Sequence, residues 1–353
     1  MLISHTSITA RISDLFKRVD YAKDIRYLKR YIPHKHIRWT GSGREALRQI
    51  LLQSDSKNVG IQAFTCHVVL DAIKAAGCKP VFYGSGAVAE IDEIEKIIKK
   101  IDALVVPYNF GFLPEIDKIA ALCKKHNVIF IEDCAAALGA EYKGKLAGTF
   151  GDYAFYSFGI SKCIGFVGGL VASDKQLKLE KYGLKPFPAL SLAKTMIEVM
   201  IAPIFFNPYI YPLARHLLDF ELDKHKSQKL IIPKSMKVNF FESYSMPKFG
   251  IKVVLNQFKR YGKIMQIRKD NAELLMGRYG KYSIITPKKS SQPSWLYFVI
   301  CSDNRAKLIK SLSSKDRIEF SYMRTYADLS GNSKKATKEQ NRHMIFSLYK
   351  KLS

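Results

Sequence analysis

The sequence predicts an α/β protein whose sheet is mostly parallel, followed by a smaller α+β C-terminal domain. Between residues 59 and 131, short apolar runs alternate with stretches whose apolar residues recur at helical spacing. Runs that are apolar throughout are typical of strands covered on both faces, as in parallel sheets. The 353 residues are 47% hydrophobic, so the chain is long and apolar enough to bury a full core.

The elements expected in the first half follow in order. Residues 1–40 read as an arm that packs on the main domain, and the sequence GSGREALRQILL that follows reads as a loop leading into a helix N-terminus. Next come strand 59–64, helix 66–76, strand 80–83, helix 92–100, strand 103–110, helix 114–125 and strand 128–131.

The second half of the chain is expected to complete a large domain and then to form a separate small domain. We place a large, ligand-binding domain at 1–240 and the small domain at 241–353. The small domain would contain one long helix from about residue 244, a strand at 294–302, a helix near 305–313 and further basic helical sequence at the C-terminus.

Residues 183–240 form an apolar, aromatic and partly basic segment that interrupts this pattern. Glu198 and three prolines break its apolar stretch, and a membrane span needs about 20 mostly apolar residues. A transmembrane helix is therefore not expected. Two alternatives stay open: a packing segment between subunits or lobes, or an interfacial helical hairpin that makes peripheral membrane contact through 190–218.

Composition limits the functional classes. Lys and Arg number 57 against 31 acidic residues, which gives a net charge of +26 and makes nucleic acid, anionic lipid or a phosphorylated substrate conceivable partners. The charge is scattered, which favours a lysine-rich solvated surface and argues against nucleic acid. The six cysteines show no CxxC or zinc-type spacing, so we expect no metal site, and reduced thiols in a cytoplasmic protein without a signal peptide.

The stretch from 128 to 173 carries the candidate chemistry. Asp133 follows the end of a strand, where ligands of such sheets bind, and Lys162 lies in a Gly-rich loop. The carboxylate could hold a protonated pyridine nitrogen, and the amine could condense with an aldehyde. The alternatives are a surface lysine and an N-cap for a helix near Cys134. The loop 41–44 could bind phosphate at a helix N-terminus.

Taken together, these motifs resemble the DegT/DnrJ/EryC1/StrS family of sugar aminotransferases, which use pyridoxal 5'-phosphate (PLP) and have the aspartate-aminotransferase fold. The segments that carry the resemblance are GSGREAL, QAFTCHVVLDAI, PYNFGFLPEIDKI, IEDCAAALGAEYKGKLAGTFGD, SFGISK and GFVGGLVAS, with MPKFGIKVVLNQFKRYGKIMQIRKDNAELL further on. The resemblance covers most of the chain outside the first thirty residues and about 183–240.

The resemblance implies roles for individual residues. Lys162 would bond the cofactor and shuttle a proton, and Asp133 would pair with the ring nitrogen. The phosphate would be bound by Ser157, Gly43, Arg44 and the backbone of Glu45. Because a subset of the family carries histidine at the lysine position and dehydrates sugars, Lys162 favours transamination.

The sequence departs from the family pattern at several positions. The usual Gln three residues after the aspartate is Ala136, and the ring-stacking aromatic corresponds to Cys66. Neighbouring His67 could replace that aromatic if the turn is shifted by one. Arg44 stands for the phosphate-loop threonine, and Ser243 for the asparagine that reaches the partner subunit's phosphate.

The resemblance thus implies a homodimeric PLP-dependent aminotransferase. It would move an amino group from L-glutamate to a keto-sugar, most simply a nucleotide-linked one used for surface polysaccharide or glycoconjugates. The rival hypothesis is a specialised or non-catalytic relative that binds a membrane surface or nucleic acid. A third combines the two: an aminotransferase for a lipid-linked sugar, at the inner face of the membrane.

Overall fold

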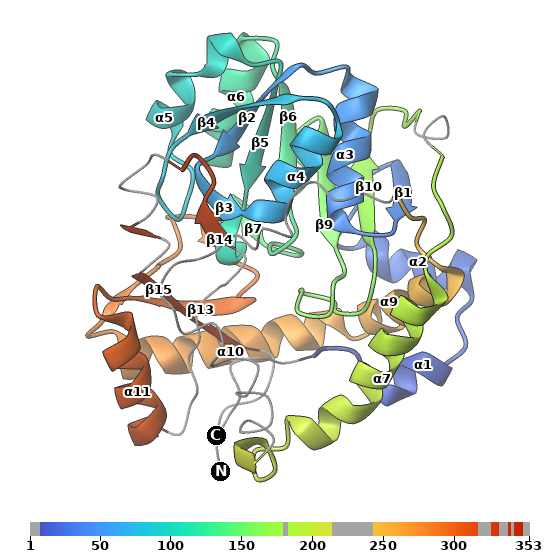
Figure 1. The fold of residues 1–353 in the computed structure, drawn as a ribbon, viewed down its shortest axis with the longest axis vertical. Coiled ribbons are helices and arrows are strands. Elements are labelled where there is room, and N and C mark those ends of the chain that lie inside the picture. Colours follow the sequence, from blue (N-terminus) through green and yellow to red (C-terminus); the bar gives the residue numbers. More distant parts are fainter. Residues whose placement is uncertain are drawn as a thin grey trace.

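A seven-stranded sheet forms the centre of the molecule (Figure 1). The computed structural model describes residues 8–178, 183–213, 243–316, 326–331, 338–339 and 342–348. The strand order is β1-β10-β9-β6-β5-β2-β4. Their bounds are β1 His36–Thr40, β2 Asn58–Gln62, β4 Lys79–Tyr83, β5 Ala103–Pro107, β6 Ile129–Asp133, β9 Tyr153–Ser157 and β10 Gly169–Ser173.

The sheet is mostly parallel, as the sequence predicted. The strands β9, β6, β5, β2 and β4 run parallel to one another, whereas β10 is antiparallel to both β9 and β1. Alternate residues of β5 face opposite layers: Val105 belongs to one apolar cluster, and Leu104 and Val106 to the other. The continuous apolar run of β5 therefore reflects burial on both faces.

Helices cover both faces of this sheet. On one face, α3 (Gly43–Ser54) and α4 (His67–Ala75) pack together over the strands. The other face is covered by α5 (Ile91–Glu95) and α6 (Ile116–Lys125), with the 3₁₀ turns Ile98–Lys100 and Asn109–Gly111 nearby. The helix expected at 92–100 is thus split into α5 and a 3₁₀ turn.

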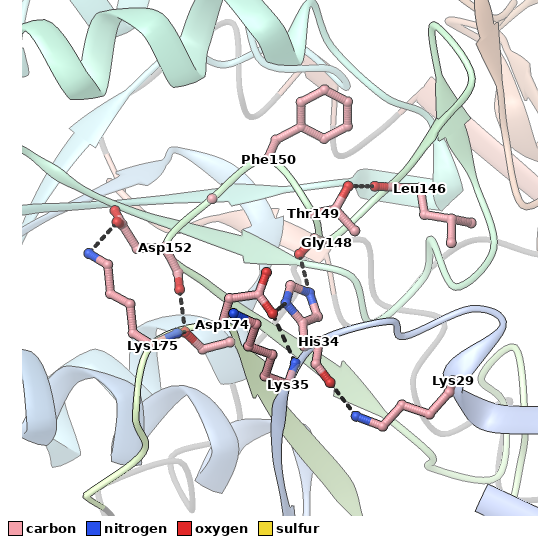
Figure 2. Close-up of polar contacts among 12 residues, drawn as sticks. Lys29, His34, Lys35, Leu146, Gly148, Thr149, Phe150, Asp152, Asp174 and Lys175 are labelled. Carbon is pink, nitrogen blue, oxygen red and sulfur yellow. Dashed lines mark hydrogen bonds and ion pairs between the residues drawn. The ribbon is translucent and has the colours of Figure 1, made fainter. Parts of the chain in front are cut away.

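The N-terminal arm packs on the main fold. Helices α1 (Ile12–Phe16) and α2 (Tyr21–Lys29) both contact α9 (Lys248–Phe258). Behind them, the buried ring of His34 forms a 2.7 Å hydrogen bond through Nε2 with the carbonyl of Gly148, and Nδ1 lies 3.7 Å from Asp174 (Figure 2). This contact ties the arm to the turn around Gly148, which follows β8 (Lys145–Leu146).

Helix α7 (Ala189–Phe205) belongs to an excursion whose two ends are held together. The N–H of Lys185 donates to the Ser243 carbonyl (2.7 Å), and the N–H of Ser245 donates back to Lys185 (2.9 Å). The N–H of Gly41 donates to Tyr244 (2.6 Å), so both ends lie beside the loop that precedes α3. No helix within the described ranges is long and apolar enough to cross a bilayer.

The predicted long helix is two helices. α9 ends at Phe258 and α10 (Tyr261–Tyr279) begins after Arg260, whose φ of −120° and ψ of 11° interrupt the helical path. The apolar periodicity continues across this break, which is why the sequence pattern did not reveal it.

Small sheets form the rest of the C-terminal part. β13 (Tyr297–Cys301) lies between β11 (Ser283–Ile284) and β15 (His343–Ser347), with α11 (Arg305–Asp316) packed on β15. β7 (Glu141–Tyr142) lies between β8 (Lys145–Leu146) and β12 (Ser291–Gln292), and β14 (Tyr326–Asp328) pairs with β3 (Phe64–Cys66). The expectation that basic C-terminal sequence is helical is therefore wrong at β14 and β15, because 343–347 is a short apolar run that pairs with β13. The division at residue 240 stays a prediction.

Candidate active site

The carboxyl ends of three parallel strands meet at one edge of the central sheet, and a cavity opens there. β5 ends at Pro107, β6 at Asp133 and β9 at Ser157, and all three residues line the cavity. The space inside, together with the open solvent at its mouth, is about 480 Å³. The remaining lining residues are Gly43, Arg44, Leu47, Cys66, Val68, Val69, Tyr108, Asn109, Ala135, Ala136, Phe155, Lys162 and Tyr326.

Asp133 is a buried carboxyl group at the base of this cavity. Its side chain is 7% exposed, and Oδ1 accepts a hydrogen bond from the N–H of Ala135 (3.0 Å). Burial raises the pKa of Asp133 to about 6, although this hydrogen bond and the charge of Lys162 oppose the rise. No helix starts at Cys134, where the chain forms a turn, so the helix N-cap alternative is wrong. Burial makes ionisation of this carboxyl group unfavourable, and a cationic group bound beside it would stabilise the ionised form.

Lys162 lies in the loop between β9 and β10, facing the same cavity. The backbone N–H of Lys162 donates to the carbonyl of Gly159 (2.8 Å). The two ends of the loop are joined by a hydrogen bond from the N–H of Phe166 to the carbonyl of Phe158 (2.7 Å). The electrostatic influence of Lys162 on Asp133 shows that the two predicted residues lie near one another. The structure therefore brings together the two residues on which the sequence interpretation depends.

Four contacts from distant parts of the chain hold the Lys162 loop in place. The guanidinium of the buried Arg268 donates to the carbonyl of Cys163 (3.1 Å). The other three contacts are Gly165 N to Thr9 Oγ1 (2.7 Å), Gln257 Nε2 to the Gly165 carbonyl (3.2 Å) and Tyr297 Oη to the Ser161 carbonyl (3.3 Å). These contacts limit the motion of the loop and so pre-position its lysine.

The N-terminus of α3 forms the wall opposite Asp133. Ser42 caps this helix by accepting a hydrogen bond from Glu45 N (3.1 Å). A Cβ at Gly43 would lie 2.8 Å from Ser157 Cβ, and one at Gly169 would lie 2.5 Å from Gly43 N. The missing side chains therefore allow the helix N-terminus to approach the strand ends closely, which exposes N–H groups and the positive end of the helix dipole to the cavity.

The predicted phosphate residues do not all face the cavity. Gly43, the exposed Arg44 and Ser157 do. Glu45 is 1% exposed, its N–H is used by Ser42, and its carboxylate contacts Arg48 (3.2 Å). Burial raises the pKa of Glu45 against the opposing charge of Arg48. A backbone contact from Glu45 to phosphate stays a prediction.

Cys66 lines the cavity, and His67, the first residue of α4, is not among the lining residues. An aromatic side chain enters from elsewhere: Tyr326, brought in by the pairing of β14 with β3, stands directly across from Cys66. Its ring stacks on Phe110 at 4.9 Å and 14°. Sequence reasoning missed Tyr326, since no local pattern indicates that long-range pairing.

Asn109 is a second lining residue that the sequence reasoning missed. It follows the end of β5, accepts from Thr65 Oγ1 (2.9 Å) and donates to the carbonyl of Phe64 (3.0 Å). A polar residue just after a strand end was a usable signal.

Ala136 also lines the cavity, and its carbonyl accepts from Ser294 Oγ (2.6 Å). Ser243 accepts a hydrogen bond from Arg48 (2.9 Å) and is not among the cavity residues of its own chain.

Glu132 supports the site from behind. It is fully buried and accepts hydrogen bonds from Tyr108 Oη (2.7 Å) and from the N–H groups of Gly148 (2.6 Å), Phe150 (2.7 Å) and Gly151 (2.5 Å). Burial raises its pKa, and these donors oppose the rise. Glu132 therefore fastens the turn at 148–151 to β6, directly before Asp133.

The described part of the chain contains no group of three or more His, Cys, Asp or Glu residues placed to hold a metal ion. The side chains of the cavity instead combine a buried carboxyl group, an amine, a guanidinium and a helix N-terminus. This set fits an organic ligand that carries an anionic group at one end and a basic ring nitrogen at the other.

Comparison with known proteins agrees with this geometry. Residues 25–185 match the DegT/DnrJ/EryC1/StrS aminotransferase family. The family match contains every predicted site residue, from Gly43 to Lys162.

Curated relatives and solved structures extend the comparison. GDP-perosamine synthase of Escherichia coli O157:H7 is 32% identical over 166 residues, 43% of this chain and 45% of that protein. The pleiotropic regulatory protein of Geobacillus stearothermophilus is 32% identical over 184 residues, 47% and 49% respectively. The chain thus matches about half the length of these curated relatives.

The fold is shared over a much longer stretch. The putative sugar aminotransferase Spr1654 from Streptococcus pneumoniae, in its PMP form, superposes with a TM-score of 0.71 at 17% identity, covering 100% of this chain and 94% of that one. PseC from Helicobacter pylori gives 0.70 at 17% identity, covering 98% and 94%. The predicted aspartate-aminotransferase-like fold is therefore confirmed.

Proposed function

We propose that this chain is a PLP-dependent aminotransferase that moves an amino group, from L-glutamate, to a keto-sugar. The observation that carries the proposal is the meeting of Asp133, Lys162 and the α3 N-terminus in one cavity. The match of residues 25–185 to the DegT/DnrJ/EryC1/StrS aminotransferase family supports it.

The residues present fit PLP. The close approach of Gly43 to Ser157 leaves a narrow cradle of N–H groups, and Arg44 adds a full positive charge for a phosphate. Asp133, held at a raised pKa by burial, would regain a favourable ionised state beside a protonated ring nitrogen. Tyr326 and Val69 would offer apolar surface to the ring.

The bound cofactor would act as an electron sink for a carbanion. Lys162 would provide the covalent attachment and, when a donor amine takes its place, the base that carries the proton. Asp133 would hold its charge on the ring nitrogen throughout. The anchored Lys162 loop keeps the amine close to the reacting carbon, which reduces the entropic part of the barrier.

The keto-sugar is proposed to be nucleotide-linked and used for polysaccharide or glycoconjugate synthesis. The relatives named GDP-perosamine synthase and UDP-N-acetyl-3-dehydro-alpha-D-glucosamine 3-aminotranferase support this substrate class. The net charge of +26 would favour a diphosphate-bearing substrate. We further propose a homodimer in the cytoplasm, which sedimentation of the purified protein tests.

The decisive experiment is loading with PLP followed by borohydride. The wild-type protein should show visible cofactor absorbance, and reduction should fix the cofactor mass on the peptide that contains Lys162. Lys162→Ala should lose both signals, whereas Lys99→Ala, at an exposed lysine, should keep them. Absence of fixed mass at Lys162 in the wild-type protein would refute the proposal.

The reaction itself is tested by a half-transamination. L-glutamate should convert the loaded protein to its amino form with release of 2-oxoglutarate, and keto-sugar nucleotides should reverse the spectral change. If cofactor binds but no amino donor or keto-sugar nucleotide changes the spectrum, cofactor binding stands and the transaminase activity is refuted.

A further inference from the structure

Helix α7 exposes an apolar face that the described chain does not cover. Leu190 is 83% exposed, Ile197 52% and Ile204 59%. The inner side of the helix is apolar too, with Val199 and Ala202 buried. A helix that is apolar on all sides is normally enclosed, so a face with this much exposed apolar area indicates a contact surface.

Helix α1 extends this face. It packs against α7 in the lower right of Figure 1, and it exposes Phe16 at 70% and Ile12 at 41%. We define the α1–α7 surface by Phe16, Leu190, Ile197, Met200, Ile201 and Ile204. Past the end of α7 the apolar exposure continues, with Tyr209 at 78% and Leu213 at 71%. An exposed tyrosine beside aliphatic side chains suits a boundary between water and an apolar phase.

The exposed charged residues on and immediately beside these two helices are mostly basic. Arg11, Lys17 and Arg18 on and beside α1 are exposed, as is Lys194 on α7. The acidic residues are less available, since Asp14 is 1% exposed and paired with Arg260, and Glu198 is half-buried. The surface therefore combines exposed apolar side chains with an adjoining positive charge.

This combination distinguishes between two possible occupants. A second copy of the chain docked on this surface would bring a second set of the same basic residues against the first, and these would repel. An anionic bilayer would attract the basic residues and accept the apolar ones. No described helix can cross a bilayer, so the contact would be peripheral.

We propose that the α1–α7 surface binds the face of an anionic lipid bilayer, with the outer side chains of α7 inserted among the headgroups. Ile197, Ile201 and Ile204 provide the insertion, and Lys17, Arg18 and Lys194 provide the attraction. The surface is separate from the cavity at the sheet edge, so this proposal does not depend on the proposed aminotransferase activity.

The test is co-sedimentation of the full chain with vesicles. Vesicles of phosphatidylglycerol and phosphatidylcholine should bind the protein, and vesicles of phosphatidylcholine alone should bind it far less. The double substitution Ile197→Asn/Ile201→Asn should reduce partitioning at least tenfold. Lys17→Gln/Lys194→Gln should reduce it by roughly fivefold for each charge removed, and added salt should abolish that difference.

The matched control is Leu274→Asn, which removes an exposed leucine, 40% accessible, from α10. It should partition like the wild type, and unchanged circular dichroism will show that all variants fold. The proposal is overturned if anionic vesicles fail to bind the wild-type protein, or if the Ile197/Ile201 variant binds equally well. Conversion of a dimer to a monomer by that variant, without loss of vesicle binding, would assign the surface to a second copy instead.

Discussion

Asp133→Asn should make the cofactor-free protein more stable at neutral pH. Burial raises the pKa of Asp133 to about 6 from an ordinary value of 3.8, so the folded state binds this proton more tightly than the unfolded chain. The stability contributed by the group is full below the unfolded pKa, falls as the pH rises toward about 6, and is constant above it. The difference between the folded and the ordinary pKa of Asp133 corresponds to roughly 3 kcal/mol of stability. Asparagine has no charge to bury, so the variant escapes this loss.

The assay is urea unfolding of both proteins, without cofactor, across this pH range. The free energy of unfolding of the variant minus that of the wild type should increase by roughly 3 kcal/mol between about pH 4 and about pH 7. Asp117→Asn is the control with the opposite sign, because the bond from Lys143 lowers the pKa of Asp117. A difference for Asp133→Asn that stays flat with pH would refute the reasoning. Added PLP should favour the wild type, since only aspartate offers the ring nitrogen a charge.

Three further changes test separate parts of the site. Glu132→Gln places an amide against three backbone donors and should cost about 3 kcal/mol in thermal unfolding; an unchanged Tm would contradict the anchoring role. Tyr326→Leu should weaken PLP binding up to tenfold in a spectral titration, while the exposed Tyr209→Leu should leave it unchanged. Burial lowers the pKa of His34, so stability is full above about pH 6.5 and is lost as the pH falls. His34→Gln should therefore flatten the decline in Tm between about pH 7 and about pH 5, and an identical decline would exclude His34 as its cause.

The sequence predicted the parts of the site that lie at strand ends. Asp133 stands out because a buried strand leaves a regular apolar pattern in the sequence and its carboxyl end is where ligands bind. Lys162 lies in the Gly-rich loop that follows the end of β9. Gly43 could also be predicted from the sequence, because a loop of small residues before a helix indicates an exposed helix N-terminus.

The parts that sequence could not predict depend on pairing between distant segments. Tyr326 reaches the cavity only because β14 pairs with β3, and a three-residue strand has too little periodicity to be recognised. β15 has the same difficulty, because a five-residue stretch with three consecutive apolar residues suits a helix or a strand equally. The break between α9 and α10 at Arg260 involves no proline or glycine at that residue, so its sequence resembles an uninterrupted helix.

The segment that contains α7 leaves the main fold and returns to it at the same place. Because Lys185, Ser243 and Ser245 are hydrogen-bonded to one another, the rest of the fold meets the same two anchor points whatever chain length lies between them. Loop-closure entropy grows only slowly with length, so a change in the number of residues between these anchors costs little loop-closure entropy. A tight turn joining residues 185 and 243 would therefore keep every residue that lines the cavity, while it removes the α7 part of the α1–α7 surface together with the buried contacts of Val199.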